Sequence, residues 1–107
     1  NGGELFGNRL LSPRTVRMMS TDQLGGMYKG FSQQDQGVSF GYTVAVTEDP
    51  NAAGARRSTG AFGWGGAFGT RSWTDPEEEL TAVLMLQQPN NAARYDFDNA
   101  VQQAIID

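Results

Sequence analysis

A block rich in glycine and aromatic residues near the middle of the chain constrains the fold most. Residues 60–74 read GAFGWGGAFGTRSWT. Such a density of glycine disfavours a long helix, because glycine loses more conformational freedom on folding than other residues. Aromatic residues favour strands, and glycine within a strand marks a close approach of another backbone or a ligand. The block therefore predicts two short strands joined by a tight glycine turn.

The first helix is predicted over residues 13–23. Ser12 suits its N-cap, and Pro13 suits its first position, where no backbone N–H is required. A glycine pair at 25–26 favours its end, because glycine readily takes the left-handed conformation that follows a helix.

Two further segments have strand patterns. Residues 38–46 alternate between large apolar and small side chains, as in a strand with one well-filled face. Residues 80–86 read LTAVLML. A strand that is apolar on both faces is usually central and covered on both sides.

The end of the chain predicts a second helix. After a break at 89–91, apolar residues recur on one helical face at Ala93, Phe97, Ala100, Val101, Ala104 and Ile105. The expected fold is α+β, with an antiparallel sheet of about three strands near 38–46, 66–74 and 80–87 and a helix at each end. Residues 1–107 form a single domain in this interpretation.

Composition excludes several functions. The net charge is −4, whereas a nucleic-acid-binding protein typically carries an excess of positive charge. Cysteine and histidine are absent, which excludes thiolate metal sites, cysteine nucleophiles and a Ser-His-Asp triad. No cofactor or metal is expected, and no apolar run approaches the ~20 residues of a membrane span. Because the chain begins with Asn1 and not methionine, we expect it to be processed or part of a longer protein.

Two charged clusters are candidate sites. Asp75 and residues 77–79 form an acidic group at a turn, where converging carboxylates could hold a metal. A solvated hairpin end is the favoured interpretation. Arg56, Arg57 and Arg71 could grip a carboxylate or phosphate, but exposed charge is the more common arrangement in a loop.

The glycine-rich block is the third candidate. It lacks the strand–GxGxxG–helix context of a dinucleotide site and the lysine of a phosphate-binding loop. One interpretation is a tight hairpin with aromatic packing. Another is a stand-alone binding module, whose contact surface would be Phe62, Trp64, Phe68 and Trp73.

Two stretches carry a family resemblance. Residues 1–25, NGGELFGNRLLSPRTVRMMSTDQLG, resemble a segment that precedes the last strands in serine hydrolases of the β-lactamase-related superfamily. Residues 60–88 resemble the strand–turn–strand ending of class C-like β-lactamases and family VIII carboxylesterases. The final helix is similar too. The resemblance covers essentially the whole chain, but only the C-terminal part of a full family member.

The resemblance implies that this chain lacks the catalytic groups. The family's nucleophile lies in a Ser-x-x-Lys motif and its base in a Tyr-x-Asn or similar motif. Neither is present, since the single lysine, Lys29, follows Gly26 at that spacing. Acyl transfer needs an activated nucleophile, so the isolated chain is expected to be inactive.

The resemblance also implies a role for the glycine-rich strand, which lines the active site in the family and donates a backbone N–H to the oxyanion hole. The expected lining residues are Trp64, Gly65 and Gly66, although spacing counted from Leu80 matches Ala61-Phe62-Gly63 instead. The expected substrate is a small-molecule ester or β-lactam. Esters are favoured because neither motif contains a lysine or histidine to hold a β-lactam carboxylate.

Two further expectations follow from the family. Its members point to the bacterial cytoplasm or periplasm. In the full fold, two N-terminal strands extend the sheet beyond residues 80–86. Without them this strand would be an edge, which invites self-association of the chain.

Overall fold

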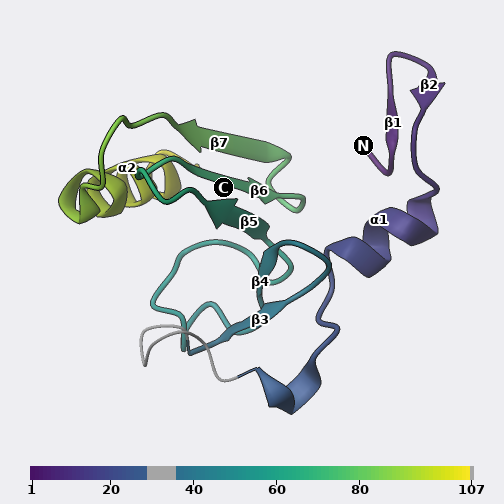
Figure 1. Cartoon of the computed structure of the whole chain (residues 1–107), viewed down its shortest axis with the longest axis horizontal. Helices are drawn as coiled ribbons and strands as arrows, with labels where there is room; N and C mark the ends of the chain where they lie inside the picture. The colour runs from purple at the N-terminus through teal and green to yellow at the C-terminus, as the bar shows by residue number, and fades with distance from the viewer. Residues whose placement is uncertain (29–35, 107) are drawn as a thin grey trace.

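The computed structural model describes residues 1–28 and 36–106 (Figure 1), so Lys29 lies outside the described residues. The α+β class is confirmed, but the main sheet has five strands instead of about three. The elements, in chain order, are β1 (Glu4–Leu5), β2 (Asn8–Arg9), α1 (Pro13–Met19), the 3₁₀ helix η1 (Gly25–Met27), β3 (Val38–Phe40), β4 (Ala45–Thr47), β5 (Phe62–Gly65), β6 (Arg71–Asp75), β7 (Leu80–Leu84) and α2 (Asn91–Gln103).

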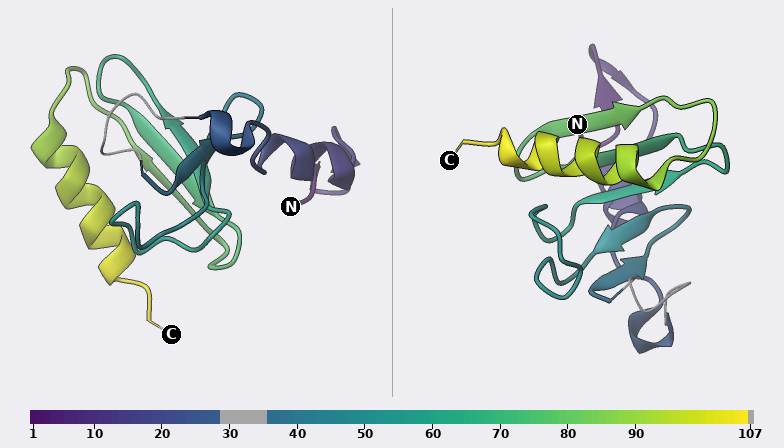
Figure 2. Two further views of the ribbon diagram at one scale, coloured as in Figure 1. Left: turned by 90° about the horizontal axis from the view of Figure 1, so that it is seen from below. Right: turned by 90° about the vertical axis from the view of Figure 1, so that its left-hand side faces the viewer.

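The main sheet is an antiparallel meander. Its strand order is β3-β4-β5-β6-β7, so each strand pairs with its neighbours in sequence. Helix α2 lies along one face of this sheet (Figure 2). The glycine-rich block forms β5, a tight turn and β6, as predicted. Within the described residues, the buried apolar core is small and consists of Val46, Ala61, Trp73 and Ala82.

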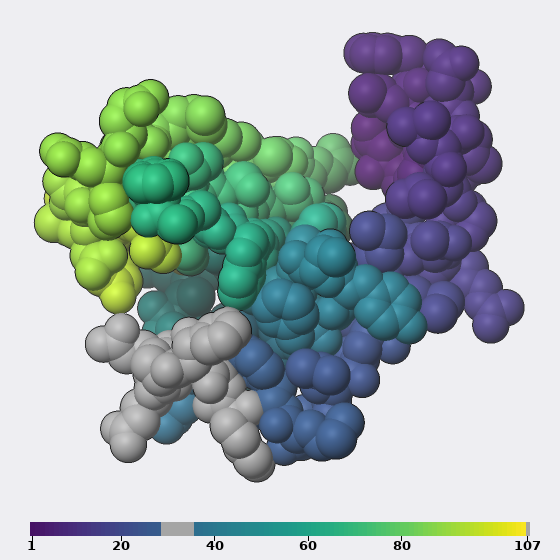
Figure 3. Space-filling view, viewed as in Figure 1, coloured from purple at the N-terminus to yellow at the C-terminus, as the bar shows by residue number. Residues whose placement is uncertain are grey.

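The N-terminal arm, residues 1–19, stands to one side of the sheet (Figures 1 and 3). It comprises the β1–β2 hairpin and α1. Phe6 and Gly7 form the hairpin turn, and both have positive φ, as a two-residue turn of the favoured twist requires. Most of the large apolar side chains of the arm are exposed. The exposed ones are Leu5, Phe6, Leu10, Leu11 and Met18.

Helix α1 begins where the sequence predicts and ends earlier. Ser12 Oγ accepts a hydrogen bond from the N–H of Thr15 at 3.1 Å, which confirms the cap. The helix stops at Met19 instead of residue 23. Ser20 Oγ donates to the carbonyl of Val16 at 2.9 Å, and such local side-chain bonds compete with helix continuation.

The predicted strand 38–46 is wrong as a single strand, because it folds into the β3–β4 hairpin. A Cβ at Gly41 would lie only 2.0 Å from the carbonyl oxygen of Met19, and the N–H of Tyr42 donates to that oxygen at 3.0 Å. Thr43 then takes φ 69°. The end of α1 therefore packs on the backbone at Gly41 and interrupts the strand, a long-range contact that alternation cannot reveal.

A central position for residues 80–86, which their apolar pattern favours, is wrong for this chain, whereas the expectation that this strand is an edge without further strands is confirmed. Among the described residues, β7 pairs only with β6 and is an edge of the sheet. Ala82 is buried, whereas Val83 is 54% exposed and Met85 is 75% exposed. One face of β7 lies under α2, and its other face is apolar and open.

Helix α2 exists as predicted but buries a different face. Asn90 caps it, with Oδ1 accepting from the N–H of Ala93 at 3.0 Å. Its buried residues are Asp98 and Gln102, both polar. The predicted apolar face is only half-buried at Phe97 and is exposed at Ala100. Asp98 is buried because Arg57 and Arg71 pair with it, and Gln102 is buried where its Oε1 accepts the backbone N–H of Arg56 at 2.6 Å.

Candidate functional site

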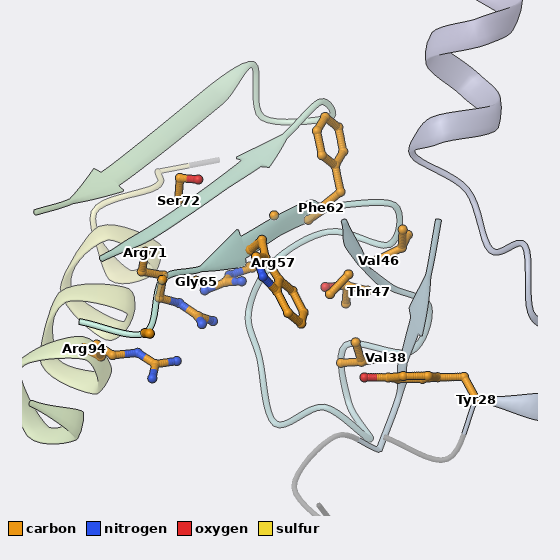
Figure 4. A pocket seen from close by; sticks show the side chains of 16 residues that line it. Tyr28, Val38, Val46, Thr47, Arg57, Phe62, Gly65, Arg71, Ser72 and Arg94 are labelled. Carbon is orange, nitrogen blue, oxygen red and sulfur yellow. The ribbon is translucent and has the colours of Figure 1, made fainter. Parts of the chain in front are cut away.

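A cavity of about 430 Å³ lies beside β5 (Figure 4). The end of β5 and the turn that follows it form one edge. One wall is aromatic and aliphatic, with Tyr28, Val38, Phe62 and Trp64. The opposite wall carries three arginines, Arg57, Arg71 and Arg94. Strands, loops and a helix that are distant in sequence therefore meet around one space.

All residues of the predicted glycine motif reach this cavity. Trp64, Gly65 and Gly66 line it, and so does the alternative motif at 61–63. Trp64 stands edge-on to Phe40, with ring centroids 5.2 Å apart. Both motif alignments, 64–66 and 61–63, therefore place residues at the cavity. The directions of the backbone N–H groups distinguish individual residues.

The peptide groups of β5 alternate between its two neighbouring strands, as in any antiparallel strand. The N–H of Gly66 donates to the carbonyl of Thr70 at 2.7 Å, across the hairpin toward β6. The N–H of Gly65 therefore points the opposite way, toward the β4 side. On that side, pairing of β4 with β5 ends at Ala45 opposite Gly63. The Gly65 N–H is thus aimed beyond the end of β4.

The glycines of β5 differ in what they need. A Cβ at Gly63 would lie 2.2 Å from the carbonyl oxygen of Ser72 and 2.8 Å from Cβ of Trp73. Gly63 is therefore required by packing against β6. At Gly65 the nearest atom to such a Cβ is 3.4 Å away, which is ordinary contact. Gly65 has room for a side chain inside its own hairpin.

A buried ion cluster backs the cavity wall. Asp98 of α2 accepts a hydrogen bond at Oδ1 from Nε1 of Trp73 at 2.9 Å. Its Oδ2 lies 2.7 Å from Nη2 of Arg57 and 2.7 Å from Nε of Arg71. The guanidinium of Arg57 also stacks over the Trp73 ring, 4.3 Å from the ring centre.

The favoured sequence interpretation of these arginines is wrong for Arg57 and holds for Arg56. The Arg57 side chain is only 12% exposed, whereas Arg56 is exposed. Burial lowers the pKa of Arg57 to about 10 and Asp98 opposes that shift, so Arg57 stays cationic at neutral pH. Arg94 has no carboxylate partner within the described residues. The cavity wall therefore holds more positive than negative charge.

The acidic cluster does not converge on a site. Asp75 is fully buried, and its carboxylate accepts from the N–H groups of Ser58, Glu77 and Glu78 at 2.8, 3.2 and 3.4 Å. The solvated interpretation is therefore wrong for Asp75, which closes a turn, while residues 77–79 are exposed. In the described ranges, no group of three or more acidic, histidine or cysteine side chains could hold a metal ion.

The four aromatic residues of the proposed contact surface do not share one face. Trp73 is buried, while Trp64 is 48% exposed and Phe68 is 71% exposed at the turn. Through residues 1–28 and 36–106, no helix is long and apolar enough to cross a membrane.

Comparison with known sequences identifies the family. The profile of the family described as Beta-lactamase matches residues 3–105. The chain belongs to the beta-lactamase family. Among its relatives, Protein Rv1367c of Mycobacterium tuberculosis strain H37Rv is 34% identical over 92 residues, covering 79% of this chain and 23% of that protein. Esterase EstB of Burkholderia gladioli is 36% identical over 56 residues, covering 52% of this chain and 14% of EstB.

A solved structure shares the fold. EstCE1, described as a hydrolase with promiscuous acyltransferase activity, superposes with a TM-score of 0.70 at 24% identity, covering 90% of this chain and 25% of EstCE1. The family resemblance read from the sequence is therefore confirmed. The chain spans about a quarter or less of the length of these relatives.

Proposed function

We propose that this chain forms the oxyanion side of the active site in a serine hydrolase that acts on small-molecule esters. The nucleophile and its base would come from another part of the same protein, because this chain holds no Ser-x-x-Lys motif. The family match and the esterase relative support this assignment. The observation that carries it is the direction of the Gly65 N–H at the cavity.

In the proposed reaction, a serine oxygen attacks the ester carbonyl carbon and the carbonyl oxygen becomes an oxyanion. The N–H of Gly65 donates to that oxygen, because β4 supplies no paired residue opposite it. The N–H of Gly66 is already bonded to Thr70. Collapse of the intermediate expels the alcohol and leaves an acyl-enzyme, which water hydrolyses. Donors of this kind contribute about 3 kcal/mol each to the transition state.

Trp64 would form a wall of the pocket that receives the acyl group. Its ring lines the cavity and is oriented by the edge-on contact with Phe40. Replacing Trp64 with alanine should change the preferred acyl chain length, because it alters pocket shape and not charge stabilisation. Hydrolysis of p-nitrophenyl esters of increasing chain length measures this preference.

The test of the oxyanion role compares two neighbouring glycines in the full-length protein. Gly65→Val should lower kcat for p-nitrophenyl esters about 10²–10³-fold with little change in KM, because the substituent displaces the oxyanion from its donor. Gly66→Val is the matched control, since its Cβ has the same 3.4 Å clearance and its N–H serves the hairpin. Circular dichroism checks that both variants fold.

Three outcomes contradict the proposal. If both folded variants keep the parental kcat, the strand serves packing alone. If only Gly66→Val loses activity, the donor is misassigned. The third outcome is hydrolysis of these esters or of nitrocefin by the isolated 107-residue chain, blocked by a serine-directed phosphonate, because the nucleophile would then lie within this chain.

A further inference from the structure

We infer that Asp98 is a positioning residue for the glycine segment of β5, acting as the shared counter-ion of Arg57 and Arg71. Its catalytic consequence rests on the proposed function. Asp98 lies on α2 and touches neither Gly63 nor Gly65 in the contacts described above. Its effect on β5 passes through three side chains that bracket that strand.

The first connection runs through Trp73. Trp73 is directly opposite Gly63 in the β5–β6 register, and its Cβ fills the space that a Gly63 side chain would need. Asp98 Oδ1 accepts the indole N–H at 2.9 Å, in a buried contact. A buried ring has few alternative orientations once its single polar atom is bonded. Asp98 therefore fixes the orientation of Trp73, against which the backbone of Gly63 packs.

The second and third connections run through the arginines. Arg71 is directly opposite Gly65 in the register, and its Nε lies 2.7 Å from Asp98 Oδ2. Arg57 belongs to the loop that leads into β5, and its Nη2 lies 2.7 Å from the same oxygen. One carboxylate thus holds the segment before β5 and the residue beside Gly65.

The positions of Arg57 and Arg71 depend on the negative charge of one carboxylate, that of Asp98. Arg57, Arg71 and Arg94 all line the same cavity, and Asp98 is the carboxylate that pairs with two of them. Removing one partner of a buried pair leaves uncompensated charge, which costs far more than the net worth of the pair. Without Asp98, mutual repulsion should move Arg57 and Arg71 apart and displace the β5–β6 hairpin.

Two substitutions in the full-length protein separate charge from shape. Asp98→Asn keeps an oxygen that can accept from Trp73 but removes the charge. We expect kcat to fall at least about tenfold with KM changed less than about threefold, since a displacement near 1 Å can cost about 10²-fold. Asp96→Asn is the control, because Asp96 is an exposed acid on the same helix, and it should leave kcat unchanged.

Asp98→Gly supplies a readout that a merely structural role would not move. It removes the carboxylate and leaves a space between Arg57, Arg71 and Trp73. Added formate carries the same anionic group and should restore part of kcat in a saturable way, whereas chloride at equal ionic strength should not. Folded Asp98→Asn with parental kcat, or folded Asp98→Gly without formate rescue, would overturn the inference.

A fluorescence measurement keeps this test independent of activity. The emission of Trp73 is obtained as the difference between each protein and the same protein carrying Trp73→Phe, which removes the contributions of Trp64 and of tryptophans outside this chain. This emission should shift to the red in Asp98→Gly and return with formate. If the parental protein hydrolyses no ester, the proposed function fails, and formate-dependent recovery of Trp73 emission still supports the positioning role. Absence of that recovery refutes the positioning role itself.

Discussion

Replacing Asp75 should release the loop before β5 from the end of β6. The Asp75 side chain is 0% exposed. Its Oδ2 accepts from the Ser58 N–H at 2.8 Å, and its Oδ1 accepts from the N–H groups of Glu77 and Glu78 at 3.2 and 3.4 Å. Alanine removes all three acceptor contacts and leaves the Ser58 N–H without its partner.

The size of the effect follows from these contacts. A hydrogen bond to a charged group contributes about 1.5–3 kcal/mol, and a buried donor left unsatisfied costs about 1–3 kcal/mol. The Ser58 bond is short, whereas the other two share one oxygen at longer range. We therefore expect Asp75→Ala to cost about 2–4 kcal/mol of local stability. Asp75→Asn keeps one amide oxygen for Ser58 and should cost about 1–2 kcal/mol.

Amide hydrogen exchange measures this locally. Each ~1.4 kcal/mol corresponds to a tenfold change in an equilibrium constant, so the Ser58 amide of Asp75→Ala should lose at least about 25-fold of its protection. Glu77→Gln is the control, because Glu77 is exposed and surface substitutions stay within about 0.5 kcal/mol. If Ser58 protection in Asp75→Ala stays within about twofold of the parent, the Asp75 contacts do not hold the loop and the reasoning fails.

Three further predictions concern the fold and the association of the chain. Gly63→Ala should prevent stable folding, because its Cβ would lie 2.2 Å from a backbone oxygen. Gly66→Ala should be tolerated, and the melting temperatures of both variants are compared with that of the parent. The Ser39 hydroxyl holds the pKa of Asp22 below 3.8, so this contact stabilises the fold above pH 3.8 and is lost as pH falls through the lowered pKa. An NMR pH titration of the Ser39 amide should show that step, and Asp22→Asn should abolish it. The isolated chain should self-associate through the open face and edge of β7, and Val83→Lys should shift its sedimentation toward monomer; an unchanged oligomer distribution would rule out this surface.

Local signals in the sequence predict their elements correctly. Ser12 and Pro13 start α1, and Asn90 caps α2, because a cap depends on side chains within three residues of it. The glycine-rich hairpin is correct for the same reason. Its turn chemistry is contained in four consecutive residues, 66–69, which are closed by the bond from the Gly69 N–H to the Gly66 carbonyl.

Contacts between distant segments account for the errors. The alternating pattern at 38–46 contains no sign that Met19 packs on Gly41, so the break in that strand is invisible to it. The apolar run at 80–86 fits a strand covered on both sides, but residues 1–28 and 36–106 cover only one side. The family resemblance indicates that N-terminal strands of the full fold would pair with this strand, whereas the pattern of residues alone does not.

The candidate site is predictable in part. Trp64, Gly65 and Gly66 were identifiable from the motif, and all three line the cavity. Asp98 was not, because apolar periodicity assigns the buried face of a helix from its apolar residues and treats a carboxylate as solvent-facing. The available signal was an acidic residue on the last helix, placed after several arginines that have no acidic neighbour in their own segment. Using it requires matching opposite charges between different helices and strands.

The position of Asp98 in the sequence has a consequence for protein synthesis. The β5–β6 hairpin leaves the ribosome before α2, so Arg57 and Arg71 emerge before their counter-ion Asp98 does. During that interval the hairpin carries bare cations next to ribosomal RNA, a polyanion. Its final seating on α2 must therefore wait until Asp98 has cleared the exit tunnel, and until then these strands are open to mispairing.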